Sequence, residues 1–137
     1  MKKTLRILAL VSLVLILCVN ALPVYAAKSA TQTINGYTLA GSLENQNAAN
    51  AGAKTTFSAP GSRQLKVAGE GRFYTTNPRA WTPVEIKLKS STGTSVIANA
   101  VKAGYLLHAS SGIHNARVIA SNGTYEGTVY TSYTWRP

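Results

Sequence analysis

The sequence predicts an all-β fold, a single small antiparallel β-sandwich or small barrel of about seven to eight strands. Two observations indicate it. Apolar and polar residues alternate with a period of two along much of the chain after residue 27, and no stretch there keeps the i, i+3, i+4 spacing of an amphipathic helix. Turn signals rich in Gly, Pro and Asn separate the alternating segments at regular intervals, as in sandwiches and barrels.

The first 26 residues predict a cleavable signal peptide. Three basic residues precede an apolar run over 7–19, and Ala26 completes a small-x-small cleavage pattern. The run is shorter than the roughly 20 apolar residues that a membrane-spanning helix needs. We therefore expect cleavage after Ala26, which leaves residues 27–137 as one sandwich domain that works outside the cytoplasm of a bacterium.

A hairpin is the first element expected in the mature chain. The Asn-Gly pair at 35–36 is a turn signal between strands at 31–34 and 37–43, because both residue types tolerate positive φ. Residues 45–53 are small and polar, so we expect a loop there. A short strand is predicted at 54–59.

The clearest strand spans residues 63–76. Its predicted inner face consists of Leu65, Val67, Gly69, Gly71 and Phe73, which alternate with charged and polar residues. The two glycines predict a bulge or bend in this strand. After a connection at 77–83, a second alternating segment is expected to turn Val84, Ile86 and Leu88 inward and Glu85, Lys87 and Lys89 outward.

The C-terminal third predicts a hairpin around the Asn-Gly pair at 122–123, preceded by an extended run at 94–108 and a turn at 110–112. Pairing outward from a type I′ turn sets four pairs opposite one another: Ala120 and Tyr125, Val118 and Gly127, Ala116 and Val129, His114 and Thr131. This face, continued by Tyr133 and Trp135, is expected to line the core, with room at Gly127 for a large residue from the other sheet. On the opposite face, Arg117 is expected diagonal to Glu126, within reach of a weak ion pair.

The excess of basic side chains predicts that the protein binds anionic partners. The chain has 14 basic and 4 acidic side chains. Loss of the three basic residues of the signal peptide leaves 11 against 4, a net charge of +7. Such an imbalance attracts polyanions, and salt weakens the attraction. We expect wall teichoic acid, anionic polysaccharide or anionic lipid as partners, no specific recognition of nucleic acid, and self-association where edge strands stay unpaired.

The residues do not predict an enzyme, a cofactor or a metal site. The single cysteine, Cys18, lies in the signal peptide, and the chain has no aspartate to orient a catalytic histidine. His108 and His114 are expected at the edge of the core, and two histidines are too few to ligate zinc. Glu70 and Glu85 lie among cations, which is typical of interspersed surface charge and not of the acid pair of a glycoside hydrolase.

Binding is the function that remains. Aromatic rings can stack on sugars or bases while neighbouring cations meet phosphate. The candidate binding residues are Lys66, Arg72, Tyr74, Arg79, Trp81, Lys87 and Lys89. We expect a secreted, non-catalytic protein that associates with the cell envelope. The alternative function is a secreted antimicrobial, bacteriocin-like protein or small membrane-acting toxin; the alternative role for Trp81 is to plug one end of the sandwich.

Overall fold

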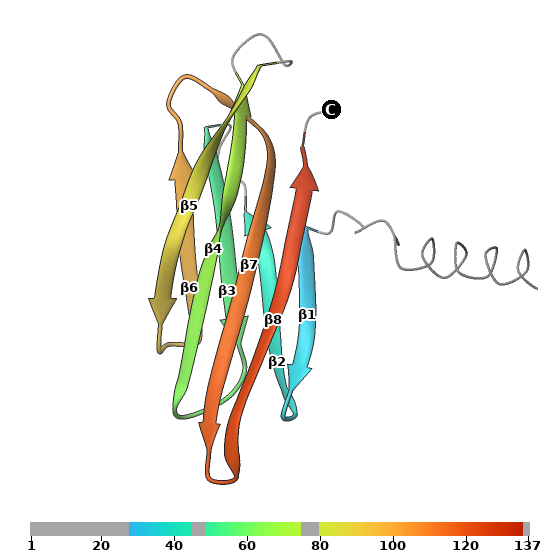
Figure 1. The fold of residues 1–137 in the computed structure, drawn as a ribbon, viewed down its shortest axis with the longest axis vertical. Helices are drawn as coiled ribbons and strands as arrows, with labels where there is room; N and C mark the ends of the chain where they lie inside the picture. The colour runs from blue at the N-terminus through green and yellow to red at the C-terminus, as the bar shows by residue number, and fades with distance from the viewer. Residues whose placement is uncertain (1–27, 45–48, 75–79, 136–137) are drawn as a thin grey trace, which may run out of the picture.

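The computed structural model describes residues 28–44, 49–74 and 80–135, which form eight strands and no helix. The strands are β1 (Ser29–Ile34), β2 (Tyr37–Glu44), β3 (Asn50–Phe57), β4 (Arg63–Tyr74), β5 (Trp81–Ser91), β6 (Ser95–Val101), β7 (Leu106–Ala120) and β8 (Gly123–Thr134). The predicted all-β sandwich is confirmed (Figure 1). The predicted signal peptide lies outside the described residues, and none of the described residues belongs to a helix that could cross a bilayer.

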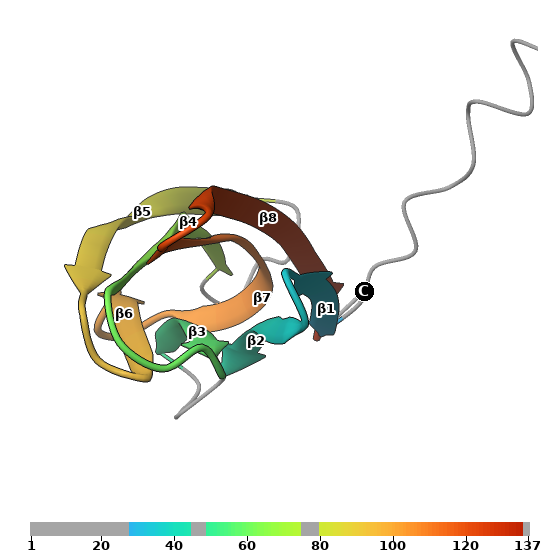
Figure 2. The ribbon, with the colours of Figure 1, turned by 90° about the horizontal axis from the view of Figure 1, so that it is seen from below.

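The strands form two four-stranded antiparallel sheets that face each other. The first sheet has the order β1-β2-β3-β6, and the second has the order β5-β4-β7-β8. Seen end-on, the two layers enclose the core, and β5 lies against β6 at one side while β1 lies against β8 at the other (Figure 2). The second sheet is the taller layer because its central strands β4 and β7 run for 12 and 15 residues.

The core lies between the sheets and follows the predicted alternation. Its largest fully buried side chains are Leu39, Leu43 and Phe57 of the first sheet and Leu65, Val67, Phe73, Ile86, Leu107 and His114 of the second. Gly127 is buried without a side chain because Ile34 of the first sheet occupies its space: a Cβ there would lie 2.3 Å from Ile34 Cδ1. The expected room at Gly127 is thus filled from the other sheet.

The two Asn-Gly turns behave differently. The first is confirmed: Asn35 and Gly36 have φ angles of 49° and 81°, and Ile34 pairs with Tyr37. In the last hairpin the two loop residues are Ser121 and Asn122, so Ala120 pairs with Gly123. Only the glycine there has a positive φ, 143°, and a type I′ turn needs two such residues.

The predicted register of the last hairpin is therefore wrong by two residues. Val118 pairs with Tyr125, Ala116 with Gly127 and His114 with Val129. A slip of two residues keeps every side chain on its own face, so the predicted core face holds along most of β7 and β8. Tyr133 is the exception: it is 38% exposed near the open end of the sandwich. Arg117 lies directly opposite Glu126, not diagonal to it, with Nε 3.3 Å from Oε1.

A bulge at Gly69 confirms the predicted irregularity in β4, but the extra residue belongs to β5. Val67 pairs with Lys89 and Gly69 with Ile86, so β5 advances three residues while β4 advances two. Beyond the bulge the faces of β5 are exchanged. Leu88, expected in the core, is 63% exposed, and Lys89 shares its side of the sheet with Val67 instead of with Glu85.

Two loop predictions are also wrong. β3 already begins at Asn50, inside the expected loop at 45–53, of which residues 45–48 lie outside the described residues. β7 runs unbroken through the expected turn at 110–112, and the chain turns earlier, near Gly104, whose φ is 78°. Glycine at position 112 is required by packing and not by a turn, because a Cβ there would lie 2.6 Å from Nε2 of the His114 ring.

Candidate binding face

Three of the predicted binding residues meet on the outer face of the second sheet. Tyr74 pairs directly with Trp81 across β4 and β5, and Arg72 lies one row away. The Arg72 guanidinium carbon is 4.5 Å from the centroid of the Trp81 ring. Arg72 Nε also donates a hydrogen bond of 2.9 Å to Oε1 of Glu70. Trp81 is 44% exposed in this stack, so it does not plug the end of the sandwich.

His108 joins this group through a second bulge. Arg72 pairs with Ala109 and Phe73 with Leu107, which leaves His108 as the extra residue of β7. Its ring meets the Tyr74 ring edge-on, with centroids 5.9 Å apart, so His108 belongs to the aromatic group and not to the core edge. His108 Nδ1 is buried and has no hydrogen-bond partner among the described residues.

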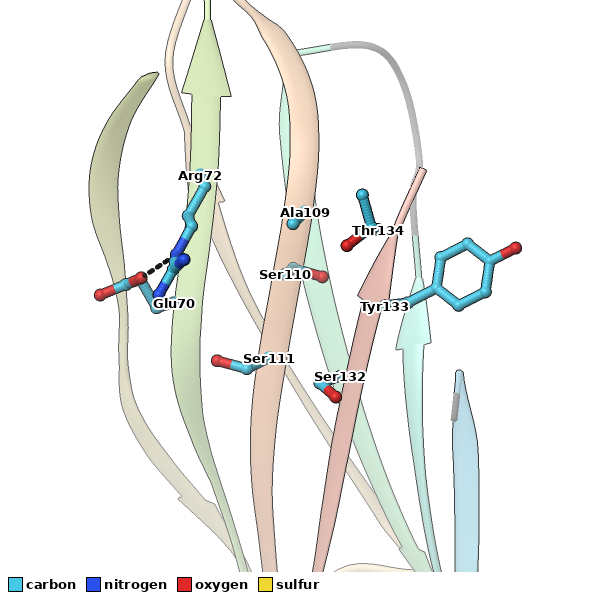
Figure 3. Close-up of a pocket in the computed structure, with 8 residues that line it drawn as sticks. All are labelled: Glu70, Arg72, Ala109, Ser110, Ser111, Ser132, Tyr133 and Thr134. Carbon is cyan, nitrogen blue, oxygen red and sulfur yellow. Dashed lines mark hydrogen bonds and ion pairs between the residues drawn. The ribbon is translucent and has the colours of Figure 1, made fainter. Parts of the chain in front are cut away.

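A hollow of about 200 Å³ opens beside Arg72 on the same face. It is lined by Glu70, Arg72, Ala109, Ser110, Ser111, Ser132, Tyr133 and Thr134. Figure 3 shows the Glu70–Arg72 ion pair on one side and the hydroxyl groups of β7 and β8 on the other. The sequence analysis missed the hydroxyl groups, although Ser111 and Ser132 lie on outward positions of two amphipathic strands and pair directly across them.

The predicted lysines gather elsewhere, at the bulge between β4 and β5. Lys66 pairs with Ser90, Lys89 pairs with Val67, and Lys87 lies within the bulge. We call these three lysines the basic margin. Lys66 is separated from Arg72 by about 20 Å of strand, since six residues rise about 3.3 Å each, whereas Lys87 lies nearer, next to the Ile86 that pairs with Gly69. The seventh candidate, Arg79, lies outside the described residues.

The basic margin has no carboxylate partner among the described residues. Three of the four glutamates form ion pairs: Glu44 with Lys54 at 3.8 Å, Glu70 with Arg72 at 2.9 Å and Glu126 with Arg117 at 3.3 Å. These pairs are exposed, so each contributes little to stability. Their effect on the surface is to neutralise three cations and to leave the excess positive charge on the remaining lysines.

A wider hollow near the last hairpin is a weaker candidate. It measures about 480 Å³ and is lined by Gly61, Ser62, Arg63, Gln64, Thr92, Arg117 and Ile119. Both of its arginines are already engaged. Arg63 donates to the carbonyls of Gly93, at 2.8 Å, and of Ala59, and Arg117 is paired with Glu126.

His114 lies in the centre of the core and not at its edge. Thr55 Oγ1 donates its one proton to the Lys66 carbonyl at 3.1 Å, so His114 Nδ1–H donates to Thr55 Oγ1 at 3.0 Å. His114 Nε2 then accepts a hydrogen bond of 2.8 Å from the hydroxyl of Thr131. Burial lowers the pKa of His114 to about 4, against a smaller opposing effect of the Lys54 backbone. The ring is a neutral link between the two sheets.

The described residues contain no group of three or more His, Asp or Glu side chains placed to hold a metal ion. The outer face of the second sheet offers an aromatic and arginine group, a small hollow lined by hydroxyl groups, and Lys66 without a carboxylate partner among these residues, whereas Lys89 lies on the inner side of the β5 edge. Compared with known proteins, the chain matches no protein-family model and no curated protein sequence, and its function is inferred from this face alone.

Proposed function

We propose that this protein is a secreted, non-catalytic β-sandwich that binds anionic components of the bacterial cell envelope, such as wall teichoic acid, anionic polysaccharide or anionic lipid. The observation that carries the proposal is the distribution of charge. Three of four glutamates are used in ion pairs, and Lys66, Lys87 and Lys89 lie together without such partners among the described residues.

The geometry suits a repeating polymer better than a single small ligand. Lys66 and the Arg72–Trp81 stack lie about 20 Å apart along β4, and Lys87 lies between them along the strand direction. A chain of phosphates or uronates that runs along the strand reaches both. At physiological ionic strength a charge is screened beyond about 8 Å, so each cation acts on the anionic group next to it.

Catalysis is not part of the proposal. His114 is enclosed in the core between two threonines, and Glu70 is held by Arg72. The hollow beside Arg72 is lined by serine and threonine hydroxyls, which orient sugar or glycerol hydroxyl groups by hydrogen bonds. We assign it the role of contacting the uncharged part of the polymer.

The proposal is tested by co-sedimentation of residues 27–137 with isolated bacterial cell walls at low and at high salt. We expect pelleting at low salt that is lost at high salt. The double variant Lys87→Gln/Lys89→Gln removes two charges of the basic margin, and we expect it to weaken binding about tenfold or more.

The matched control is Lys54→Gln/Lys102→Gln, which has the same net charge but leaves the basic margin intact. It should pellet almost as well as the unmodified protein. An equal loss of wall binding in both variants would mean that binding follows total charge and that the basic margin is not a specific binding site. Failure of the unmodified protein to pellet at either salt would refute envelope binding.

A further inference from the structure

An exposed apolar row crosses the outer face of the second sheet at right angles to its strands. Ala68 of β4 pairs with Ile113 of β7, and Ile113 pairs with Tyr130 of β8. Leu88 lies beside Ala68 in the β5 bulge. Leu88, Ile113 and Tyr130 are 63%, 47% and 67% exposed. We call these four residues the apolar row.

The opposite outer face of the sandwich has a different character. Its outward positions are mainly small and polar, among them Thr38, Ala40, Ser42, Thr56 and Ser95. Among the described residues of that face, Val101 is the one large hydrophobic side chain that is strongly exposed, at 62%. The molecule therefore presents one apolar sheet face to its surroundings and not two, which is typical of an interaction surface.

Charges of opposite sign flank the apolar row. On one side the next row contains Lys66, which pairs with Asn115. On the other side the next row contains Glu70 and Glu85, which pair with each other across β4 and β5. Lys66 and Glu85 form no ion pair with any described residue. Like charges directly opposite each other destabilise a sheet unless a cation approaches them.

We propose that this chain forms a homodimer in which the second sheets of two copies pack face to face. The two-fold axis runs along the apolar row, between the two copies. A rotation by 180° about this axis places each strand over the same strand of the partner, with its direction reversed. A residue on one side of the apolar row therefore faces a residue that lies equally far from the row on its other side. Lys66 of each copy then faces Glu70 and Glu85 of its partner. The contact is isologous, so this ion pairing occurs twice.

The size of the face is sufficient for a dimer. Four strands are roughly 19 Å wide and a strand of 12 residues is about 40 Å long, which gives about 750 Å² per copy. A stable interface buries about 800 Å² per partner. Packed sheets are rotated by about 30°, which displaces distant rows but leaves the rows next to the axis opposed.

A two-fold axis parallel to the strands is the other symmetric arrangement, and the charges disfavour it. It would set Lys66 against Asn115 and the two glutamates against serines of the partner. Charges would then be buried without an opposite charge, which is costly. In the proposed dimer the β5 edges of both copies lie side by side, with Lys87 and Lys89 at the open rim. The dimer covers Lys66 and the Arg72–Trp81 stack, so on this face it excludes the polymer and leaves only the rim lysines, Lys87 and Lys89, for envelope binding.

Sedimentation velocity of residues 27–137 over a range of concentrations, at low and at high salt, tests the proposal. We expect a monomer–dimer equilibrium for the unmodified chain. Ile113→Lys should give monomers, and Lys66→Glu or Glu85→Lys alone should each weaken the dimer about tenfold. The double variant Lys66→Glu/Glu85→Lys should recover part of the affinity, because the exchanged charges at positions 66 and 85 still attract each other although Glu70 remains acidic.

The control is Val101→Lys, which places the same charge on the other outer face and should leave the dimer unchanged. Because Ile113 is exposed, its variant should unfold at nearly the same temperature as the parent, and this is checked alongside. A chain that stays monomeric at every concentration, or a double variant no better than the single ones, overturns the proposal.

Co-sedimentation with cell walls tests the proposed function separately from the dimer. Because the dimer covers part of the polymer-binding face, pelleting is measured at a concentration at which the chain is monomeric. A chain that fails to pellet there refutes envelope binding, and a dimer seen at higher concentration still stands. A chain that pellets but is monomeric at every concentration refutes the dimer alone. If the unmodified chain is monomeric and Ile113→Lys abolishes binding to anionic phospholipid vesicles, the apolar row is a membrane-contacting surface and the dimer is wrong.

Discussion

His114 shows how a single polar residue can link two sheets. It projects from β7 and bonds to Thr55 of the first sheet and to Thr131 of β8, with both ring nitrogens satisfied. Gly41 of β2 makes room for the ring, since a Cβ there would lie 2.3 Å from His114 Cδ2. The chain has no cysteine beyond residue 18, so the sandwich has no disulfide, and buried contacts of this kind hold its layers together.

The pKa of His114 predicts acid sensitivity. Its pKa is lowered to about 4 in the folded state from 6.5, so the unfolded chain binds the proton first as pH falls. The stability from the neutral ring is therefore complete above pH 6.5 and is lost as pH falls from there toward 4. We expect a loss of about 2 kcal/mol between pH 7 and pH 5.

Urea unfolding at the two pH values measures this loss. In His114→Asn the side chain does not titrate, and the difference in unfolding free energy between pH 7 and pH 5 should nearly vanish, although the variant is less stable at both. Equal stability of the unmodified protein at pH 7 and pH 5 would contradict the assignment.

At the scale of elements, the alternation of residues predicts faces better than it predicts pairing. The core faces of β4, β7 and β8 follow from period-two patterns because a slip of two residues leaves a pattern unchanged. The register of the last hairpin could not be read in this way. It depends on whether Asn122 takes a positive φ together with Gly123, as a type I′ turn requires, and in the structure only Gly123 does so.

Bulges are the second limit of sequence reasoning. Nothing in the run from Val84 to Lys89 signals an extra residue, yet the bulge exposes Leu88 and divides the predicted lysine face. At the same point β4 also approaches β7 closely, since a Cβ on Gly69 would lie 2.0 Å from the Ser111 carbonyl oxygen, and such a contact between distant segments is not visible in the sequence. The aromatic group of the candidate site was predictable because Tyr74 and Trp81 are neighbours in a local hairpin.

The two Asn-Gly pairs give an element-scale prediction with a built-in control. Asn35 has a φ of 49°, which asparagine tolerates better than alanine, whereas Asn122 has no positive φ. We expect Asn35→Ala to lower the unfolding free energy by about 1 kcal/mol and Asn122→Ala to change it little. Thermal unfolding of both variants is the measurement. A larger effect at Asn122 than at Asn35 would show that the second turn is type I′ after all.

At the scale of the whole molecule, the two outer faces of the sandwich differ in composition. The outward residues of β1-β2-β3-β6 are mainly small or polar, whereas the outer face of β5-β4-β7-β8 combines the apolar row, the Arg72–Trp81 stack and Lys66 of the basic margin. Both proposals therefore concern one sheet, and the other serves as scaffold. Variants on the scaffold face are the natural controls for every binding experiment, because they alter charge or polarity without touching the candidate residues.

The pairing of β4 with β7 has a kinetic consequence. Arg63 meets Val118 at the centre of the second sheet, and β5 and β6 lie between the two strands in the chain. The second sheet cannot form until the two ends of this long intervening segment have been brought together. Such non-local pairing slows folding to milliseconds or seconds. Stopped-flow refolding should give a rate in this range, and refolding within microseconds would contradict it. Slow closure of the sandwich suits the secretion that we propose, because a chain that stays extended can be threaded through a narrow channel and can close its sheets afterwards.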